Sequence, residues 1–278
     1  MDLFDEISFK ASKLVTKTYS TSFSIAVSFL SKEMRHAIYS IYGFVRFADE
    51  IVDTFHHVKQ KLVLDNFERD YHEAIENGIS LNPILHSFVL TVKKYKIPSD
   101  LVDSFLKSMR ADLNKLNYND SSELKEYIYG SADVVGLMCL MVFVNGDMDL
   151  YLKLEKPAMK LGSAFQKVNF LRDLKADIEQ LDRRYFPEFN KESFDETMKN
   201  KLIKDIESDF CEAKAGIKEL PGKSKLAVFI AFVYYKQLLK NLKNTPATKV
   251  MQTRIRVSDR GKIVLLGKAY IKYQFNII

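Results

Sequence analysis

Helix-breaking residues are scarce in this sequence, and that scarcity restricts the fold more than any other feature. The 278 residues include only ten glycines and six prolines, so long stretches lack the residues that end helices or form tight turns. Between the prolines, apolar residues recur about every 3.6 residues, which is typical of amphipathic helices. No segment alternates convincingly between apolar and polar residues, as a strand would. The pattern predicts an all-α fold of eight or more helices in one domain, residues 1–278.

Capping residues and prolines predict where these helices begin and end. The predicted helices cover about 32–55, 99–116, 121–144, 157–181 and 224–242. Ser99 or Asp100 is expected to cap the second of them, and Ser121 or Ser122 the third. Pro157 is expected to begin the fourth, because proline is well tolerated in the first turn of a helix.

Charge and hydropathy narrow the class of protein. A formal net charge of +6 suits an anionic ligand, a membrane surface or nucleic acid. No cluster of Lys and Arg is dense enough to predict a nucleic-acid partner. The longest apolar run, 134–144, is well short of the about 20 residues that cross a bilayer, so it is expected to be a buried core helix.

Two other features predict a cytoplasmic protein. The first residues, MDLFDE, are acidic and lack the positive and apolar regions of a signal peptide. Cys139 and Cys211 have no metal-binding spacing and are expected to be reduced thiols.

The first informative cluster is an acidic face on the helix predicted at 32–55. Asp49 and Asp53 are four residues apart, so their side chains lie on one face, about 6 Å apart along the axis. Tyr42 and Arg46 precede them by one and two turns on the same arc. Apolar neighbours leave little room for an ordinary solvated surface. Two remedies for the repulsion between the carboxylates are open: a bound cation, or an internal salt bridge with Arg46.

A second acidic face lies on the helix predicted at 157–181. Gln166, Asn169, Asp173 and Asp177 fall within about a quarter of the helix circumference. Arg172 stands beside Asp173. All four side chains on the face offer oxygen atoms, which are the ligands that Mg²⁺ prefers. Two such faces in one chain, each beside an arginine, favour a binding site over a solvated surface.

At these residues the chain resembles the squalene/phytoene synthase family. The segments 42–53 (YGFVRFADEIVD) and 166–177 (QKVNFLRDLKAD) resemble the two aspartate-rich motifs of that family. Looser matches appear in the family's order: segment 19–24 with Ser20, Ser22 and Phe23, then Asp112, segment 127–136, Arg184 to Pro187, Tyr235, and Arg254 to Arg256. The resemblance covers nearly the whole chain.

The resemblance implies a helical bundle with a central cavity, of the isoprenoid synthase type. It implies a magnesium-dependent enzyme, with Mn²⁺ as a substitute, that joins two prenyl diphosphates head to head. The implied metal ligands are Asp49, Asp53, Asp173 and Asp177, with Asn169 in support. Tyr42 and Tyr127 are implied at the reacting centre, and the implied substrate-binding residues are Ser20, Ser22, Phe23, Arg46, Gln166, Asn169, Arg172, Tyr235 and Arg254.

The product follows less directly from the resemblance. The compact chain is most similar to bacterial carotenoid-pathway members, which favours phytoene from two geranylgeranyl diphosphates. The alternative is dehydrosqualene or squalene from farnesyl diphosphate, and a non-catalytic assembly factor is a third. No glycine-rich dinucleotide fingerprint is present, and NADPH is not expected. A lipid product suggests contact with the inner face of a membrane.

One residue departs from the family pattern, and one pair could suggest a further metal site. Asp133 stands where the family has a glycine in segment 127–136. Its carboxylate matters only if it faces the cavity. His56 and His57 are adjacent, so they point to different faces of a helix, and a surface position is expected for both.

Overall fold

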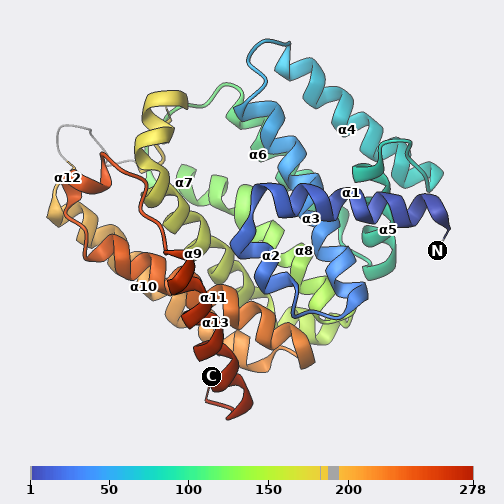
Figure 1. Cartoon of the computed structure of the whole chain (residues 1–278). Helices are drawn as coiled ribbons and strands as arrows, with labels where there is room; N and C mark the ends of the chain where they lie inside the picture. The colour runs from blue at the N-terminus through green and yellow to red at the C-terminus, as the bar shows by residue number, and fades with distance from the viewer. Residues whose placement is uncertain (1, 182, 187–193, 278) are drawn as a thin grey trace. The chain divides into compact units, whose positions relative to one another are not determined.

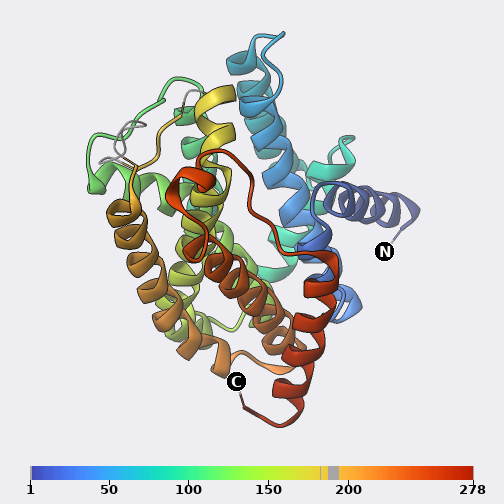
Figure 2. The ribbon, with the colours of Figure 1, turned by 60° about the vertical axis from the view of Figure 1, so that its left-hand side comes forward.

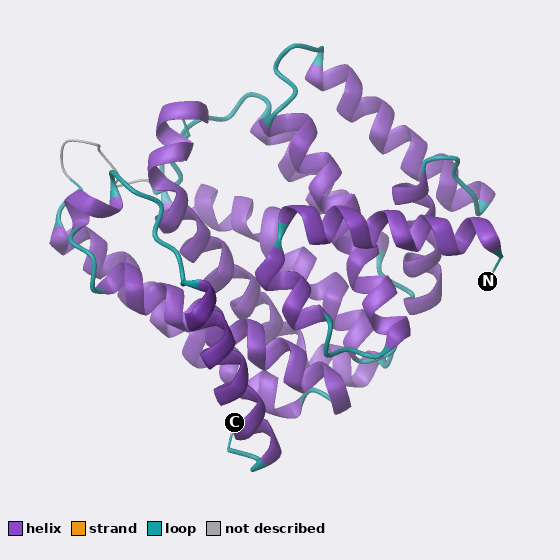
Figure 3. Ribbon diagram, viewed as in Figure 1, coloured by secondary structure: helices purple, strands orange, loops and turns teal. Residues whose placement is uncertain are grey.

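The fold is built from helices. The computed structural model describes residues 2–181, 183–186 and 194–277, and every regular element within these ranges is a helix (Figure 1, Figure 3). The described residues form one isolated parallel bridge, between Asn117 and Arg184. The predictions of an all-α fold and of eight or more helices are confirmed.

The chain divides into two compact units. The first comprises residues 1–114 and 134–155, and the second comprises 115–133 and 156–278. Helix α9 (Met148–Leu181) contributes residues to both. The extent of a single domain over 1–278 stays a prediction, and the two units are described in turn.

The first unit surrounds one aromatic ring. Its helices are α1 (Leu3–Tyr19), α2 (Thr21–Val27), α3 (Lys32–Asp53), α4 (Gln60–Asn77), α5 (Pro83–Tyr95), α6 (Ser99–Asp112) and α8 (Val134–Phe143). Phe44 of α3 is fully buried, and its ring stacks on Phe88 of α5 at 4.0 Å between centroids. Phe67, Tyr71 and Phe105 surround the same ring from α4 and α6. Aromatic contacts therefore join four helices at the centre of this unit.

Small side chains let α1 pack closely on α3 and α5. Ser8, Ser12 and Thr16 are completely buried along one face of α1. The Ser12 hydroxyl lies 2.7 Å from that of Ser87 on α5, so both buried groups are satisfied. A Cβ at Gly43 of α3 would lie 3.0 Å from the same Ser12 oxygen. This packing supports the end of α1, where part of the candidate site begins.

The second unit holds the remaining helices. They are α7 (Ser121–Ile128), the π-helical turn η1 (Tyr129–Asp133), α10 (Glu196–Glu219), α11 (Gly222–Lys243), α12 (Ala247–Val250) and α13 (Asp259–Gln274). Phe210 of α10 contacts Phe165 of α9 and Phe232 of α11. Helices α11 and α13 lie side by side (Figure 2), and the Tyr273 hydroxyl donates to the Gly222 carbonyl at 3.4 Å.

Several helix boundaries differ from the prediction. Helix α9 begins at Met148 and continues through Pro157, so the predicted start at Pro157 is wrong. The side chain of Asp147 accepts a hydrogen bond from the Leu150 N–H at 3.1 Å, and buried Tyr151 and Leu154 anchor the first turns. Tertiary packing of these turns offsets the hydrogen bond that proline removes.

Two predicted caps are also wrong. Helix α6 follows Pro98, and neither Ser99 nor Asp100 caps it; it ends at Asp112 instead of near Leu116. Asp120, one residue before the predicted serines, caps α7 by accepting from the N–H groups of Ser122 and Glu123. An aspartate side chain caps as well as a serine, so residue preference alone does not choose between neighbours. Helices α3 and α11 match their predicted ranges within two residues.

The helix predicted at 121–144 is interrupted by the turn η1. There the backbone approaches α9 so closely that a Cβ on Gly162 would lie 2.8 Å from the Ala132 carbonyl oxygen. Glycine at 162 is what allows this contact. The extra backbone residue of a π-helical turn shifts the helix locally, which periodicity of apolar residues does not reveal.

Hydropathy alone does not settle the role of this segment. The helical stretch Ser121–Phe143 is long and apolar enough to cross a membrane, with a mean hydropathy of 1.4 over its most apolar window. More than half of that window, 56%, is buried by the rest of the protein. Core helices of soluble proteins meet the same criterion, so it assigns no membrane span.

Asp133, at the end of η1, is buried against α9. Asp133 is only 8% exposed, and its Oδ1 has no hydrogen-bond partner among the residues that the structure describes. Burial, reinforced by the charge of Asp209, raises the pKa of the Asp133 carboxyl to about 7. Lys167 and Lys160 act in the opposite direction. The residue that departs from the family pattern therefore faces a charged cluster on α9 and α10.

The close approach at Gly162 predicts a stability effect. We expect Gly162→Ala to lower the free energy of unfolding by about 1–3 kcal/mol, because the new methyl group meets backbone that must shift. Gly267→Ala is the matched control in α13, since a Cβ there meets nothing within 4 Å. That change should stabilise the protein by about 0.5–1 kcal/mol. Urea unfolding measures both, and equal effects at the two positions would contradict the packing argument.

The raised pKa of Asp133 predicts a pH dependence. Between pH 3.8 and about 7 the folded protein keeps a proton on Asp133 that the unfolded chain releases. Stability from this group is therefore present at low pH and falls by about 1.4 kcal/mol per pH unit through this window. We expect Asp133→Asn to remove this slope, so that the difference in unfolding free energy between variant and wild type grows from pH 4.5 to 7. A difference independent of pH would contradict the assignment.

Candidate active site

The first aspartate-rich face lies on the last turns of α3, in the first unit. The Arg46 Nη1 donates to Asp49 Oδ2 at 2.7 Å, and Nη2 pairs with Glu50. The guanidinium group also lies over the Tyr19 ring, 4.3 Å from its centroid. The sequence left open whether a cation or Arg46 neutralises the repulsion between Asp49 and Asp53, and the structure contains the salt bridge with Arg46. The Asp49 side chain remains 34% exposed, and Asp53 is half-buried one turn later.

The N-terminal segment packs against this face. Ser20 lies at the corner between α1 and α2, and its hydroxyl accepts from the Phe23 N–H at 3.4 Å. The Phe23 ring stacks on Tyr42 at 5.2 Å, one turn before Arg46. Ser22 is half-buried on α2. The corner thus brings Tyr19 and Phe23 onto the arc that the sequence predicted for Tyr42 and Arg46.

The histidine pair after this face lies at the surface. His56 and His57 are both exposed, as expected. Cys139 and Cys211 are both free thiols, also as expected.

The second aspartate-rich face lies on α9, in the second unit, and arginines hold its central carboxylate. Arg172 Nε donates to Asp173 Oδ1 at 2.9 Å, and Nη2 contacts Oδ2. Arg254, which follows α12 in the chain, approaches the same carboxylate with Nε at 2.7 Å. Burial alone would lower the pKa of Arg172, but the hydrogen bond and charge of Asp173 raise it. Both arginines are predicted site residues, and the structure brings them together.

A basic recess opens beside Asp173. It has a volume of about 240 Å³, and its lining comprises Arg172, Asp173, Lys175, Ala176, Glu179 and Arg254. Three cations and two carboxylates make the lining net positive. Lys175 and Glu179 are lining residues to which the sequence gave no role.

Asn169 and Tyr235 meet on the same side of α9. The Tyr235 hydroxyl donates to Asn169 Oδ1 at 3.3 Å, and its ring stacks on Phe165 at 3.9 Å. Burial raises the pKa of Tyr235, so the hydroxyl keeps its proton and acts as a donor. Gln166, one turn before Asn169, is half-buried.

Tyr127 lies in an aromatic cluster. Its ring contacts Tyr118 at 4.9 Å and Tyr185 at 5.5 Å, and Phe170 of α9 stacks on Tyr185 at 3.8 Å. Tyr127 is only 7% exposed. The cluster ties α7 and the residues after α9 to the helix that carries the second face. Pro187, predicted to close this motif, lies outside the described residues.

The metal prediction has a donor set but no ready-made cage. Among residues 2–181, 183–186 and 194–277, no three His, Cys, Asp or Glu side chains are close enough to hold a metal ion. Each face offers two aspartates at i and i+4, with carboxylates partly accessible on Asp49 and Asp173. Mg²⁺ in phosphate-binding sites commonly takes one or two carboxylates and fills its remaining positions with water and phosphate oxygens. The donor set fits that mode of binding, and the ligand roles stay predictions.

Two residues of the first face, in the matched segments 19–24 and 42–53, were given no role by the sequence. Tyr19 lies beneath Arg46, and Glu50 shares its guanidinium with Asp49. The i,i+4 spacing of Arg46 and Glu50 was a readable signal for the second contact. Nothing local indicated the first, because Tyr19 belongs to another helix. Asp112, which the resemblance also matched, is 5% exposed at the end of α6.

The sequence is similar to a known family of enzymes. The sequence profile named Squalene/phytoene synthase matches residues 16–261. A chloroplastic phytoene synthase from an Oncidium hybrid cultivar is 28% identical, with 92% of this chain and 66% of that protein covered, so the chain spans about two thirds of this plant relative. The phytoene synthase of Arthrospira platensis is 27% identical, with 95% and 93% covered.

Solved structures show the same fold. A dehydrosqualene synthase crystallised with a ligand superposes with a TM-score of 0.82 at 22% identity, covering 97% of this chain and 98% of that one. A squalene synthase from Alicyclobacillus acidocaldarius gives 0.70 at 19% identity, with 97% of each chain covered. At these identities the likeness establishes the isoprenoid synthase fold. Because the profile matches most of the sequence, including both aspartate-rich faces, the chain belongs to the squalene/phytoene synthase family.

Proposed function

We propose that the protein joins two prenyl diphosphates head to head, and that its substrates are two molecules of geranylgeranyl diphosphate, giving phytoene. The observation that supports this most is the pair of helical faces that each combine two aspartates with an arginine. Similarity to the phytoene synthases from Oncidium and Arthrospira supports geranylgeranyl diphosphate as the substrate of this chain.

The reaction needs a stabilised leaving group. The allylic C–O bond of one substrate breaks, and diphosphate departs with the electron pair. The double bond of the second substrate attacks the resulting cation, and loss of a proton closes a cyclopropyl-carbinyl diphosphate. This intermediate ionises in turn, rearranges and loses a second proton to give phytoene. No hydride donor is needed, so NADPH is not expected.

The chain's own residues would bind and neutralise the diphosphates. Asp49, Asp53, Asp173 and Asp177, supported by Asn169, are proposed to hold Mg²⁺ or Mn²⁺, which supplies positive charge to the leaving diphosphate. Arg46, Arg172 and Arg254 are proposed to exchange their carboxylate partners for diphosphate oxygens, because a guanidinium binds either group in the same bidentate way.

The remaining site residues would orient the prenyl groups. Ser20 and Ser22 are proposed to hydrogen-bond diphosphate. Phe23, Tyr42 and Tyr127 would present their aromatic faces to the cations, because the face of an aromatic ring attracts positive charge. Gln166 and Tyr235 would contact a prenyl group beside the second face, and an apolar wall would keep water from the cations.

A product assay tests the reaction and the substrate together. The purified chain is incubated with Mg²⁺ and either geranylgeranyl or farnesyl diphosphate, with and without NADPH, and the extracted hydrocarbon is identified. Phytoene without NADPH is expected. A thirty-carbon product would replace the substrate assignment with dehydrosqualene or squalene synthesis. No hydrocarbon from folded protein would overturn the enzyme proposal and favour a non-catalytic assembly factor.

The aspartates provide the sharpest mutational test. We expect Asp49→Asn and Asp173→Asn each to lower kcat by roughly 100-fold or more, because losing a metal ligand removes several kcal/mol of charge stabilisation. Asp149→Asn is the control, since Asp149 is an exposed carboxylate in the first turn of α9. Initial rates at saturating substrate measure the effect, and an equal loss in all three variants would contradict the metal roles.

We also propose that the protein works in the cytoplasm, in contact with the inner face of the membrane. Helix α13 and the residue after it support this, because Ile263, Val264, Ile271 and Phe275 are 71%, 53%, 57% and 71% exposed. Lys268 and Lys272 are exposed beside them. Exposed apolar residues flanked by lysines are typical of helices that lie on anionic lipid.

Vesicle sedimentation tests the membrane contact. We expect more protein to sediment with phosphatidylcholine vesicles containing phosphatidylglycerol than with phosphatidylcholine alone, and less at high salt. Ile271→Glu with Phe275→Glu should lower the bound fraction several-fold, because both place a charge in the apolar face. Leu14→Glu on α1, at a residue 68% exposed, should leave it unchanged. Equal recovery of wild type with and without vesicles would argue against the contact.

A further inference from the structure

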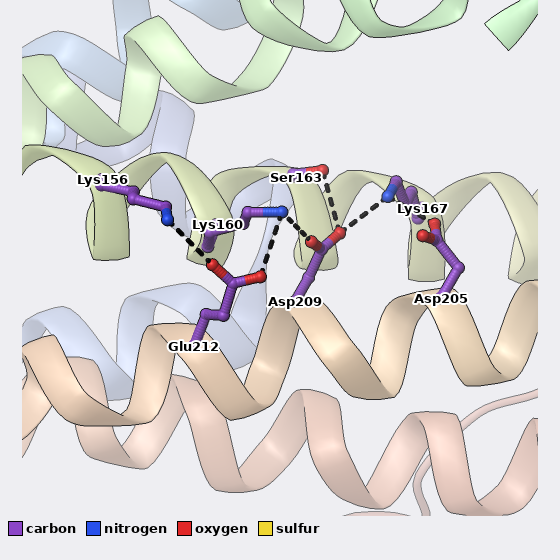
Figure 4. Close-up of polar contacts among 7 residues, drawn as sticks. All are labelled: Lys156, Lys160, Ser163, Lys167, Asp205, Asp209 and Glu212. Carbon is purple, nitrogen blue, oxygen red and sulfur yellow. Dashed lines mark hydrogen bonds and ion pairs between the residues drawn. The ribbon is translucent and has the colours of Figure 1, made fainter.

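A charged cluster outside the proposed site joins α9 to α10. Asp209 of α10 receives three side chains from one face of α9 (Figure 4). Lys160 Nζ donates to Oδ1 at 2.7 Å, Lys167 Nζ donates to Oδ2 at 2.7 Å, and the Ser163 hydroxyl lies 3.2 Å from Oδ2. Asp209 is therefore the common acceptor for residues that span two turns of α9.

The centre of this cluster is buried and its edges are exposed. Asp209 is only 3% exposed, and the Lys167 side chain is 15% exposed. Each lysine has a second partner at the edge: Asp205, at 2.5 Å from Lys167, is 60% exposed, and Glu212, at 3.4 Å from Lys160, is 41% exposed. Burial would raise the pKa of Asp209, but the two lysines lower it, so the carboxyl stays ionised.

The geometry of the helix links this cluster to the second aspartate-rich face. The residues that bind Asp209 lie roughly 120° around α9 from Gln166, Asn169 and Asp173. A rotation of α9 that turned those side chains away would also break all three contacts to Asp209. Buried charge networks can fix one register between packed elements even where they add little stability.

The opposite flank of α9 is held by rings. Phe210, the neighbour of Asp209, contacts Phe165 at 6.1 Å, and Phe165 stacks on Tyr235, whose hydroxyl bonds to Asn169. Adjacent residues of α10 thus contact α9 on both sides of the face that carries Asn169. The charged contact joins three residues of α9 to one carboxylate, whereas the ring contact joins only Phe165 of α9 to Phe210.

We propose that Asp209 is a positioning residue, which sets the rotation of α9 and thereby aims Asn169, Asp173 and Asp177 at the metal and diphosphate. The metal role of these residues rests on the proposed function; the control of α9 by Asp209 does not. Asp209→Asn keeps the size of the side chain and removes the charge that draws both lysines together.

Hydrogen exchange of the full chain tests the control of α9 without any ligand. In Asp209→Asn we expect amide exchange in 166–177 to rise about tenfold, with little change in α11. Glu212→Gln and Asp205→Asn remove the edge partners of the same lysines and should leave exchange in 166–177 within twofold of wild type. Unchanged exchange in Asp209→Asn, or an equal rise throughout α9, α10 and α11, would overturn the proposal.

Binding of Mn²⁺ in the presence of inorganic diphosphate tests the consequence for the site. Paramagnetic resonance is expected to show about tenfold weaker Mn²⁺ binding in Asp209→Asn, the usual effect of losing a group that orients metal ligands. The triple variant Lys160→Met, Lys167→Met and Asp209→Leu separates positioning from packing. It should regain the wild-type Tm and keep the weakened binding.

Full recovery of Mn²⁺ binding in the triple variant would overturn positioning by Asp209, because packing alone would then suffice. If wild type itself binds no Mn²⁺ with diphosphate, the proposed function fails in its metal step, and the exchange experiment still decides whether Asp209 controls α9.

Discussion

Pairing of carboxylates with arginine is the interaction on which both acidic faces depend. Aspartates at i and i+4 among apolar residues repel each other unless a cation neutralises them. On α3, Arg46 contacts Asp49 and Glu50 and rests on the Tyr19 ring. On α9, Arg172 and Arg254 both hold Asp173. These pairs hold the carboxylates in position, and each arginine is then close enough to meet an anionic ligand that arrives at the face.

The second face depends further on how α9 is held. Helix α9 continues through Pro157, and its neighbours constrain it from several directions. The turn η1 meets it at Gly162, the Tyr127 cluster meets it at Phe170, and Asp209 meets it at Lys160 and Lys167. A helix constrained in this way presents its side chains in one orientation, which a site built from several of them requires.

Local sequence signals predicted the helices well where the structure is regular. Helix α3 matched within two residues, because its apolar stripe is a signal carried by the helix itself. The turn η1 and the start of α9 before Pro157 were missed. Both depend on packing: η1 on the contact with Gly162, and the first turns of α9 on buried Tyr151 and Leu154. Neither contact leaves a periodic signal.

The sequence by itself determined the two faces and the family. Residues at i, i+4 and i+8 share a helix face whatever surrounds them, so Asp49 with Asp53, and Asn169 with Asp173 and Asp177, could be grouped without a structure. Only the tertiary structure decided their partners. Arg254 reaches Asp173 across 81 residues, Asp209 reaches Lys167 across 42, and the charge of Asp209 helps to raise the pKa of Asp133. Such contacts depend on which helices pack together, and side-chain spacing along one helix carries no information about the helix beside it.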